Sequence, residues 1–289
     1  MEEPKKGREA RAAALRQTID EALARLSQQL AEGHTAEFKR LLVFWARFHR
    51  YSHANVVLIL SQRPDATRVA GYRTWRRVGR QVKRGAKAIS IWCPIIKSVE
   101  DPDTGMPIEL CVGFSSCPVF AAEDLVDIET NPLPTLWPTL PDDVDALYQR
   151  LKHRVEAAGY PVREMILPPG RQGTASMAGQ ITLATGLDSR NRTMALLHEL
   201  AHQLEHFKPE RAESPRDQRE LEAEAAAAVV CAMVGLEHPT ARDYLLMYHA
   251  DVEGLKASLG VIHRLVGQMA KLLELDRLPQ ETAAPLAAD

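Results

Sequence analysis

Two histidines and a glutamate in the second half of this 289-residue chain could together hold and use a metal ion. His198, Glu199 and His202 form the pattern H-E-x-x-H, and on a helix the residues four apart share one face. Both imidazoles can then reach one zinc ion, with Glu199 beside it to take a proton from a metal-bound water. The pattern predicts a zinc-dependent metallopeptidase, whereas the alternative is an ordinary amphipathic helix with two surface histidines.

A catalytic zinc ion needs a third protein ligand and an open position for water. Glu220 and Glu224 fall four apart on one face of a predicted helix over 215–234, which we expect Ser214 to cap. Glu220 is the expected third ligand. Glu224 is expected to accept a hydrogen bond from the free ring nitrogen of a ligand histidine, which would fix the tautomer of that histidine.

His206, on the helix that carries the H-E-x-x-H motif, and Glu222, on the predicted helix over 215–234, also lie near the expected ligands. A helix rises about 12 Å over the eight residues from His198 to His206, too far for one ion to be bound at both ends. We therefore expect His206 to be a polar residue near the helix end, where it interacts favourably with the helix dipole. Glu222 is expected to point away from the site and to pair with Arg219.

Two other features fit a peptidase site. The short strand predicted over 180–183, before the motif helix, could pair with the backbone of an extended substrate. Tyr244, Tyr248 and His249 lie where a group that stabilises an oxyanion could come from, and core packing is the alternative for each.

The first half of the chain carries an excess of basic residues. The chain has a net charge of −2, but its segments 1–34, 35–97 and 98–289 carry 0, +12 and −14. Such asymmetry is typical of a polyanion-binding part joined to a different part. Tyr51, Tyr72, Trp75 and Trp92 lie among the basic residues, as in proteins that bind single strands through phosphate contacts and base stacking. A solvated charged face with buried aromatic residues is the alternative.

The elements that must position these residues follow from apolar periodicity, turn residues and caps. Helices are predicted over 9–31, 36–48 (capped by Thr35), 54–60 (capped by Ser52), 143–158, 192–206 and 215–234, with two more within 240–274. Strands are predicted over 68–75, 88–94, 109–119 and 180–183. Four prolines between Asn131 and Pro141 indicate a stiff linker, at which we place the domain boundary.

The cysteines and the apolar segments bear on the compartment. Cys93, Cys111, Cys117 and Cys231 show no C-x-x-C spacing, so we expect them to be reduced and mostly buried. No apolar segment typical of a signal peptide follows the N-terminus, and the longest apolar run, 225–236, is too short for a bilayer span. We expect a cytoplasmic protein without a membrane partner.

Two sets of motifs resemble those of ArdC-like antirestriction proteins. The stretch Phe48-x-x-Tyr51-Ser52-x-x-Asn55, with the later Gly79-Arg80-x-Val82-x-x-Gly85-x-Lys87, resembles the N-terminal ssDNA-binding domain of that family. The motif helix and the run Glu220-Leu221-Glu222-Ala223-Glu224 resemble the zincin-like metallopeptidase domain that follows it, which is related to the ImmA/IrrE peptidases. The glycine that the family has before the last histidine is absent, and Glu205 stands there.

The resemblance implies an α+β fold with two domains. The expected organisation is a helical extension (1–34), a basic ssDNA-binding domain (35–130), a Pro-rich linker (131–142), a mostly helical zincin-like domain with a small sheet (143–275) and a flexible tail (276–289). The residues assigned to DNA are Tyr51, Asn55, Arg73, Trp75, Arg76, Arg77, Arg80, Lys83, Arg84 and Lys87.

The function that the resemblance implies is antirestriction, the protection of incoming mobile-element DNA by a protein that binds ssDNA and carries a Zn²⁺-dependent metallopeptidase site. The expected partners are single-stranded DNA and a protein or peptide substrate that the sequence does not identify. Two alternatives stay open: a regulatory peptidase of ImmA/IrrE type that cleaves a repressor, and a purely DNA-protecting protein whose zinc site is not catalytic.

Overall fold

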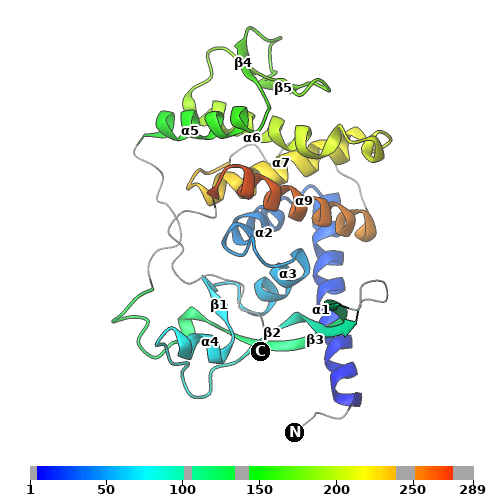
Figure 1. Ribbon diagram of the computed structural model, residues 1–289, viewed down its shortest axis with the longest axis vertical. Coiled ribbons are helices and arrows are strands. Elements are labelled where there is room, and N and C mark those ends of the chain that lie inside the picture. The colour runs from blue at the N-terminus through cyan, green and yellow to red at the C-terminus, as the bar shows by residue number, and fades with distance from the viewer. Residues whose placement is uncertain (1–4, 101–105, 134–142, 239–250, 276–289) are drawn as a thin grey trace. The chain divides into compact units, whose positions relative to one another are not determined.

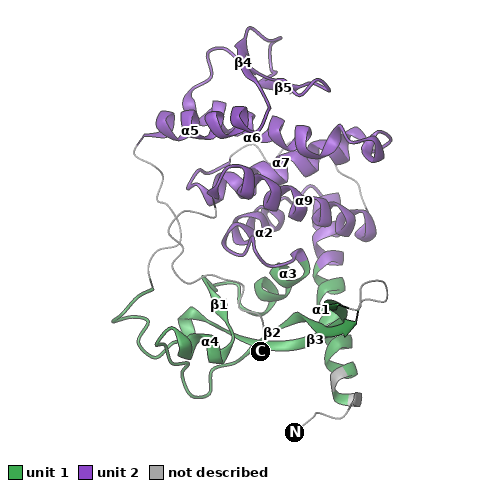
Figure 2. Ribbon diagram, viewed as in Figure 1, with its two compact units in different colours: residues 1–22, 54–134, 282–289 green, residues 23–53, 135–281 purple. Residues whose placement is uncertain are grey.

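The structure, a computed structural model, describes residues 5–100, 106–133, 143–238 and 251–275 (Figure 1). The chain divides into two compact units, each with its own contacts (Figure 2). Of the described residues, the first unit holds 5–22, 54–100 and 106–133, and the second holds 23–53, 143–238 and 251–275. Both units combine helices with a small sheet, which confirms the predicted α+β class.

The first unit is organised by a long antiparallel hairpin. Strand β2 (Ile89–Glu100) pairs with β3 (Pro107–Ala121), and the two-residue β1 (Val69–Ala70) pairs with the end of β3. The other elements of the unit are most of α3 (His53–Gln62), α4 (Tyr72–Arg77), the 3-10 turn η1 (Ala122–Asp124) and the first part of α1 (Lys5–Ala31).

Two amide side chains attach α3 to the edge of β2. Asn55 donates to the carbonyl of Trp92 over 2.9 Å and accepts from the Trp92 amide over 2.8 Å. Gln62, seven residues later on the same helical face, makes the same pair of bonds to Ser90, both at 2.9 Å. These bonds satisfy edge backbone groups that would otherwise be open to another strand.

The second unit is layered, with a small sheet beside α6 and the helices α7, α9 and α2 beyond it (Figure 1). The strands β4 (Val162–Met165), β5 (Gly173–Ala175) and β6 (Ile181–Ala184) form a sheet in the order β4-β6-β5, with β4 parallel and β5 antiparallel to β6. The helices are α2 (Ala36–Arg47), α5 (Val144–Ala157), α6 (Ser189–Ala201), the π-helical turn η2 (His202–His206), the 3-10 turn η3 (Pro209–Arg211), α7 (Arg216–Met233) and α9 (Val252–Leu272).

Helix α7 is the centre of the second unit. Every residue from Leu221 to Cys231 is buried, because α6, α9 and α2 all pack against this helix. The run Ala225 to Ala228 lets neighbouring backbones approach closely, and each fully buried Val or Leu around it contributes about 2 kcal/mol. The acidic residues of α7 are therefore held by a rigid element.

Several predicted elements differ from the structure. The predicted strand over 68–75 is wrong beyond Ala70, because Tyr72–Arg77 forms α4 behind an extended Gly71. The motif helix does not run unbroken to His206, since it changes to a π-helical turn at His202. The short strands β4 and β5 had no clear pattern and were not predicted.

The predicted caps and strand roles also need correction. Ser214 does not cap α7, which begins after Pro215 without a side-chain cap, and the Thr35 hydroxyl makes no cap hydrogen bond at α2. The strand near 180–183 exists as β6, but it lies between β4 and β5, so its backbone is paired on both sides. It cannot serve as the edge strand for a substrate.

The predicted domain limits stay a prediction, with one correction. Helix α2, which we placed in the DNA-binding domain, packs against α7 and belongs to the second unit. Most of the predicted linker, the tail after Leu275, and Tyr244, Tyr248 and His249 lie outside the described residues.

The expectation of four reduced cysteines is wrong for two of them. Cys93 and Cys117 form a disulfide, with their Cα atoms 5.9 Å apart. They are diagonal neighbours on β2 and β3, since Cys93 lies opposite Ser115 and Cys117 opposite Ile91. Cys231 is buried as expected, but Cys111 is exposed. None of the helices described is long and apolar enough to cross a membrane.

Candidate metal centre

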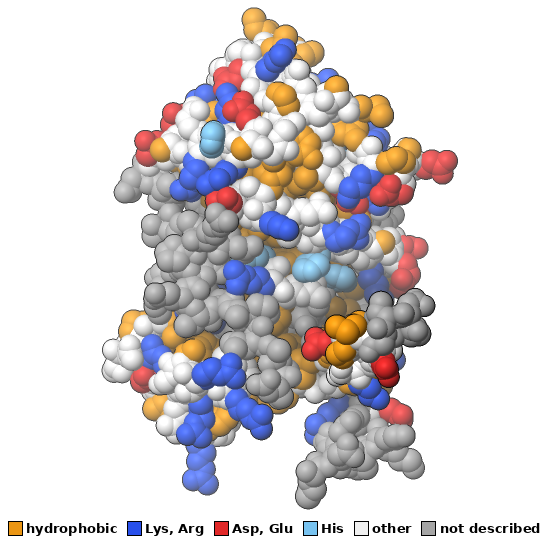
Figure 3. Space-filling view, viewed as in Figure 1, with side chains coloured by type: hydrophobic (Ala, Val, Ile, Leu, Met, Phe, Trp, Pro, Cys, Tyr) orange, Lys and Arg blue, Asp and Glu red, His pale blue; other side chains and the backbone are white. Residues whose placement is uncertain are grey.

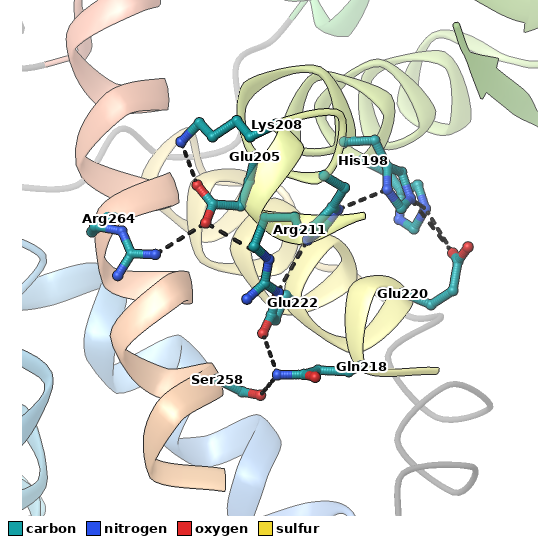
Figure 4. Close-up of polar contacts among 11 residues, drawn as sticks. His198, Glu205, Lys208, Arg211, Gln218, Glu220, Glu222, Ser258 and Arg264 are labelled. Atoms are coloured by element: carbon teal, nitrogen blue, oxygen red, sulfur yellow. Dashed lines mark hydrogen bonds and ion pairs between the residues drawn. The ribbon is translucent and has the colours of Figure 1, made fainter. Parts of the chain in front are cut away.

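The side chains of His198, His202 and Glu220 meet between α6 and α7. Glu220 Oε2 lies 3.3 Å from His198 Nε2 and 3.6 Å from His202 Nε2, and the two Nε2 atoms are 3.1 Å apart. Figure 4 shows Glu220 facing His198 across the gap between the two helices. Within the part of the chain that the structure describes, this is the group of side chains whose donor atoms lie close enough together to hold a metal ion.

The proton on His198 can be placed from its partner on the other side of the ring. His198 Nδ1 lies 2.9 Å from Glu224 Oε2, and a carboxylate can only accept, so Nδ1 carries the hydrogen. In the neutral ring Nε2 then presents a lone pair to Glu220, which is also an acceptor. Two acceptors at this distance need a cation between them, so the donor set fits a metal ion.

A proton can take the place of the metal. Burial disfavours the charged form of His198, but hydrogen bonds to Glu220 and Glu224 outweigh it and raise the pKa of this imidazole to about 10. Burial would raise the pKa of Glu220, and its bonds from His198 and His202 instead hold that pKa well below its usual range. Metal ions and protons therefore compete for this position.

Glu199 lies beside the cluster and is in contact with β5. Glu199 is 8% exposed, and its carboxyl group accepts a hydrogen bond from the backbone of Ala175. Burial raises the pKa of Glu199 to about 7, against the opposing effect of His198. A carboxyl group whose pKa lies near neutrality is suited to take up and return a proton.

The cluster opens into a cleft of about 760 Å³. One wall is β5 and the loop before it, and the other is the start of α7. The lining residues are Pro168 to Ala175, Met194, Ala195, His198, Glu199, His202, His206, Phe207, Arg216, Arg219, Glu220, Glu224 and His238.

His206 ends the helical turn and Glu222 does not line the cleft, as expected, but their partners differ from the expected ones. Both side chains are buried, at 3% and 0% exposure, and His206 Nε2 lies 3.1 Å from Glu222 Oε2. His206 Nδ1 also lies 2.8 Å from His202 Nδ1. Glu222 pairs with Arg211 and not with Arg219. His206 stays outside the ligand group, in keeping with the helix-rise argument.

His238 was missed altogether. It follows α7, lines the cleft, and places Nδ1 3.5 Å from Glu224 Oε1. No motif or spacing in the sequence relates His238 to the H-E-x-x-H helix. Its position in the cleft follows from the path of the chain after α7, which only the tertiary structure shows.

The residues assigned to DNA divide into two groups. Arg73, Arg76, Arg77, Lys83, Arg84 and Lys87 are exposed on α4 and the segment after it. Figure 3 shows Lys and Arg side chains gathered over this part of the surface. These residues are placed where a polyanion can reach them.

The others are built into the protein. Trp75 is 5% exposed and donates from Nε1 to the Phe120 carbonyl, so stacking on bases is not a role it has in this structure. Asn55 is engaged with Trp92, as described above. Arg80, 9% exposed, pairs with Asp127 over 2.7 Å. Tyr51 belongs to the second unit, where burial raises its pKa to about 12.

Fold and site together define a class: an α+β protein with a basic unit and a helical unit whose H-E-x-x-H helix faces a glutamate from the next long helix. Residues 9–110 match the family described as the N-terminal domain of anti-restriction factor ArdC. Residues 9–110 therefore form an ArdC-like N-terminal domain.

Solved structures agree on the fold. The chain is similar to the antirestriction protein ArdC from plasmid R388 in its metal-free form, with 19% identity, a TM-score of 0.50, and coverage of 78% of this chain and 83% of that one. The Mn(II)-bound form of that protein has 17% identity to this chain and a TM-score of 0.52. The match covers 89% of this chain and 96% of that one.

One curated relative is an uncharacterised protein of Bacillus anthracis, 41% identical over 68 residues, which make up 23% of this chain. The match spans only 12% of that relative's length.

Proposed function

We propose that this chain is an antirestriction protein that binds single-stranded DNA through its first unit and hydrolyses peptide bonds at a zinc site in its second. The observation that carries the enzymatic part is the convergence of His198, His202 and Glu220 beside a buried Glu199. Two imidazoles and one carboxylate are a donor set that suits catalytic zinc and leaves a position for water.

The choice of metal rests on these donors. The solved ArdC structure with Mn(II) supports a divalent ion, and nitrogen donors favour Zn²⁺ over Mn²⁺. A bound zinc ion would act as a Lewis acid and lower the pKa of a water molecule toward neutrality. Equilibrium dialysis of the purified protein with both metals, followed by metal analysis, tests the preference.

The residues of the chain account for the remaining steps. Glu199 takes a proton from the attacking water and returns it to the leaving amine, which its raised pKa permits. Glu224 keeps His198 in the tautomer that presents Nε2 to the metal. The edge strand β5, which lines the cleft and has β6 on one side only, pairs with the backbone of an extended substrate, the role we first expected of 180–183.

The DNA-binding part rests on the six exposed basic residues of α4 and the following segment. Their charges can follow the phosphates of a single strand, and the family match covers this region. The ArdC likeness supports antirestriction as the biological role of the two activities.

A second candidate, a DNA-protecting protein with a non-catalytic metal site, is favoured by the fact that the basic residues and the metal cluster lie in different units. Glu199→Ala separates the two functions. We expect this variant to retain the metal and to lose cleavage of candidate partner proteins. If protection against restriction in cells persists in the variant, protection is a matter of DNA binding. If the variant cleaves as fast as the parent, the role of Glu199 is wrong.

A further inference from the structure

A buried carboxylate on α7 has partners that connect it to the metal site. Glu222 is 0% exposed, and an unpaired charge at such a position costs several kcal/mol. Its Oε2 takes the guanidinium of Arg211 and the Nε2 of His206 at 3.1 Å, and its Oε1 accepts from Gln218 at 3.1 Å (Figure 4). The charge of Glu222 is compensated by Arg211, and the Glu222 carboxylate holds the His206 ring in place.

The hydrogens along this chain of contacts can be placed one after another. Glu222 can only accept, so His206 Nε2 donates to it. The neutral His206 then has a lone pair on Nδ1, and His202 Nδ1, 2.8 Å away, must be the donor. His202 Nε2 is left with its lone pair on the side of Glu220 and His198.

We propose that Glu222 and His206 are positioning residues that hold His202 in the tautomer and orientation needed to bind the metal. The inference rests on the proposed metal site. His198 reaches the same state through one carboxylate, Glu224, whereas His202 reaches it through an imidazole and a carboxylate. Outer partners of this kind orient the ligands they contact.

The backbone around His206 supports this role. The turn from His202 to His206 is π-helical, a geometry that is rare and concentrated at functional sites. Glu205 within it is 2% exposed and is held by Lys208 at 2.6 Å and Arg264 at 3.0 Å (Figure 4). These ion pairs keep the turn in the shape that directs the His206 ring at His202.

The test uses two substitutions of His206 in the full chain. His206→Leu removes the acceptor for His202, whereas His206→Asn keeps a side-chain oxygen near the position of Nδ1. We expect zinc affinity, measured by competition with a chromogenic chelator, to fall about 10- to 100-fold in His206→Leu and to recover in large part in His206→Asn. A merely structural role would not distinguish the two in this way.

A matched control is Lys271→Met, which replaces an exposed lysine near the end of α9 in the same unit. Circular dichroism and thermal unfolding without metal establish that each variant is folded. Long-range ¹H–¹⁵N spectra of the zinc-loaded parent should show the hydrogen of His202 on Nδ1.

The outcomes separate the proposed positioning role of Glu222 and His206 from the metal site itself. If folded His206→Leu has parental zinc affinity, or if His202 carries its hydrogen on Nε2, the positioning role of Glu222 and His206 is wrong, although the metal site can still exist. A parent protein that binds no divalent metal overturns the metal site itself. If His206→Leu fails to fold, His206→Asn and the spectra of the parent decide the question.

Discussion

Gly173 and Glu199 lie so close that a Cβ atom on Gly173 would come within 2.8 Å of both Cγ and Oε1 of Glu199. Gly173 begins the edge strand β5, whereas Glu199 comes from the motif helix α6. The glycine therefore lets the strand pass directly over Glu199, the proposed general base. The same strand supplies the backbone hydrogen bond from Ala175 to Glu199.

The first prediction concerns this contact. Gly173→Ala should push the Glu199 carboxyl away from β5 and lower the rate of peptide hydrolysis by about 10²-fold, the scale expected for misplacing a catalytic group by about 1 Å. Metal content should stay at the parental level, because no ligand moves. The control is Gly267→Ala in α9, where an added Cβ meets no atom within 4 Å. Equal activity of both variants would contradict the prediction.

The second prediction concerns acid stability. Burial would raise the pKa of Glu205, but hydrogen bonds from Lys208 and Arg264 outweigh it and lower that pKa. A carboxyl group with a depressed folded-state pKa stabilises the protein above its ordinary pKa of 4.5, and this stabilisation is lost as the pH falls through the folded value.

Urea unfolding of the metal-free protein between pH 3 and 6 measures this effect. The free energy of unfolding of Glu205→Gln should fall less steeply toward low pH than that of the parent. Parallel curves for the two proteins would show that Glu205 does not supply the dependence.

The third prediction concerns DNA. The double variant Arg76→Ala/Arg77→Ala should bind single-stranded DNA more weakly and with a smaller salt dependence, by about 0.7 in the log–log slope for each phosphate that the variant no longer neutralises. Lys97→Ala, an exposed lysine on β2 of the same unit, serves as the control. Fluorescence anisotropy from low to physiological salt provides the measurement. Affinity that does not change with salt would remove the electrostatic basis of the proposal.

The fourth prediction separates stacking from packing at Trp75. The indole is buried with Val82, Ala122 and Leu125 and bonds to the Phe120 carbonyl. Trp75→Ala should therefore lower the free energy of unfolding by about 3–5 kcal/mol. DNA affinity per folded molecule should stay near that of the parent. A stable variant with selective loss of DNA binding would restore Trp75 as a stacking residue.

Much of the fold could be predicted because its signals are local. The apolar spacing of α1, α2, α5 and α7 and the alternation in β2 each depend on residues a few positions apart. The strands β4 and β5 could not be found this way, since they are short and are held by pairing with β6. The residues of α4 have a β-rich composition, which predicted a strand. They form a helix because Trp75 packs against residues that come from later in the chain.

The sequence by itself determined the composition of the candidate metal centre. Helical periodicity alone puts His198 beside His202, and Glu220 on one face with Glu224, whatever the rest of the chain does. Tertiary structure alone decided that these faces meet, that Glu222 and His206 stand behind His202, that Gly173 passes over Glu199, and that Cys93 joins Cys117. Each of these depends on which elements pack together, and such contacts between distant residues leave no periodic trace in the sequence.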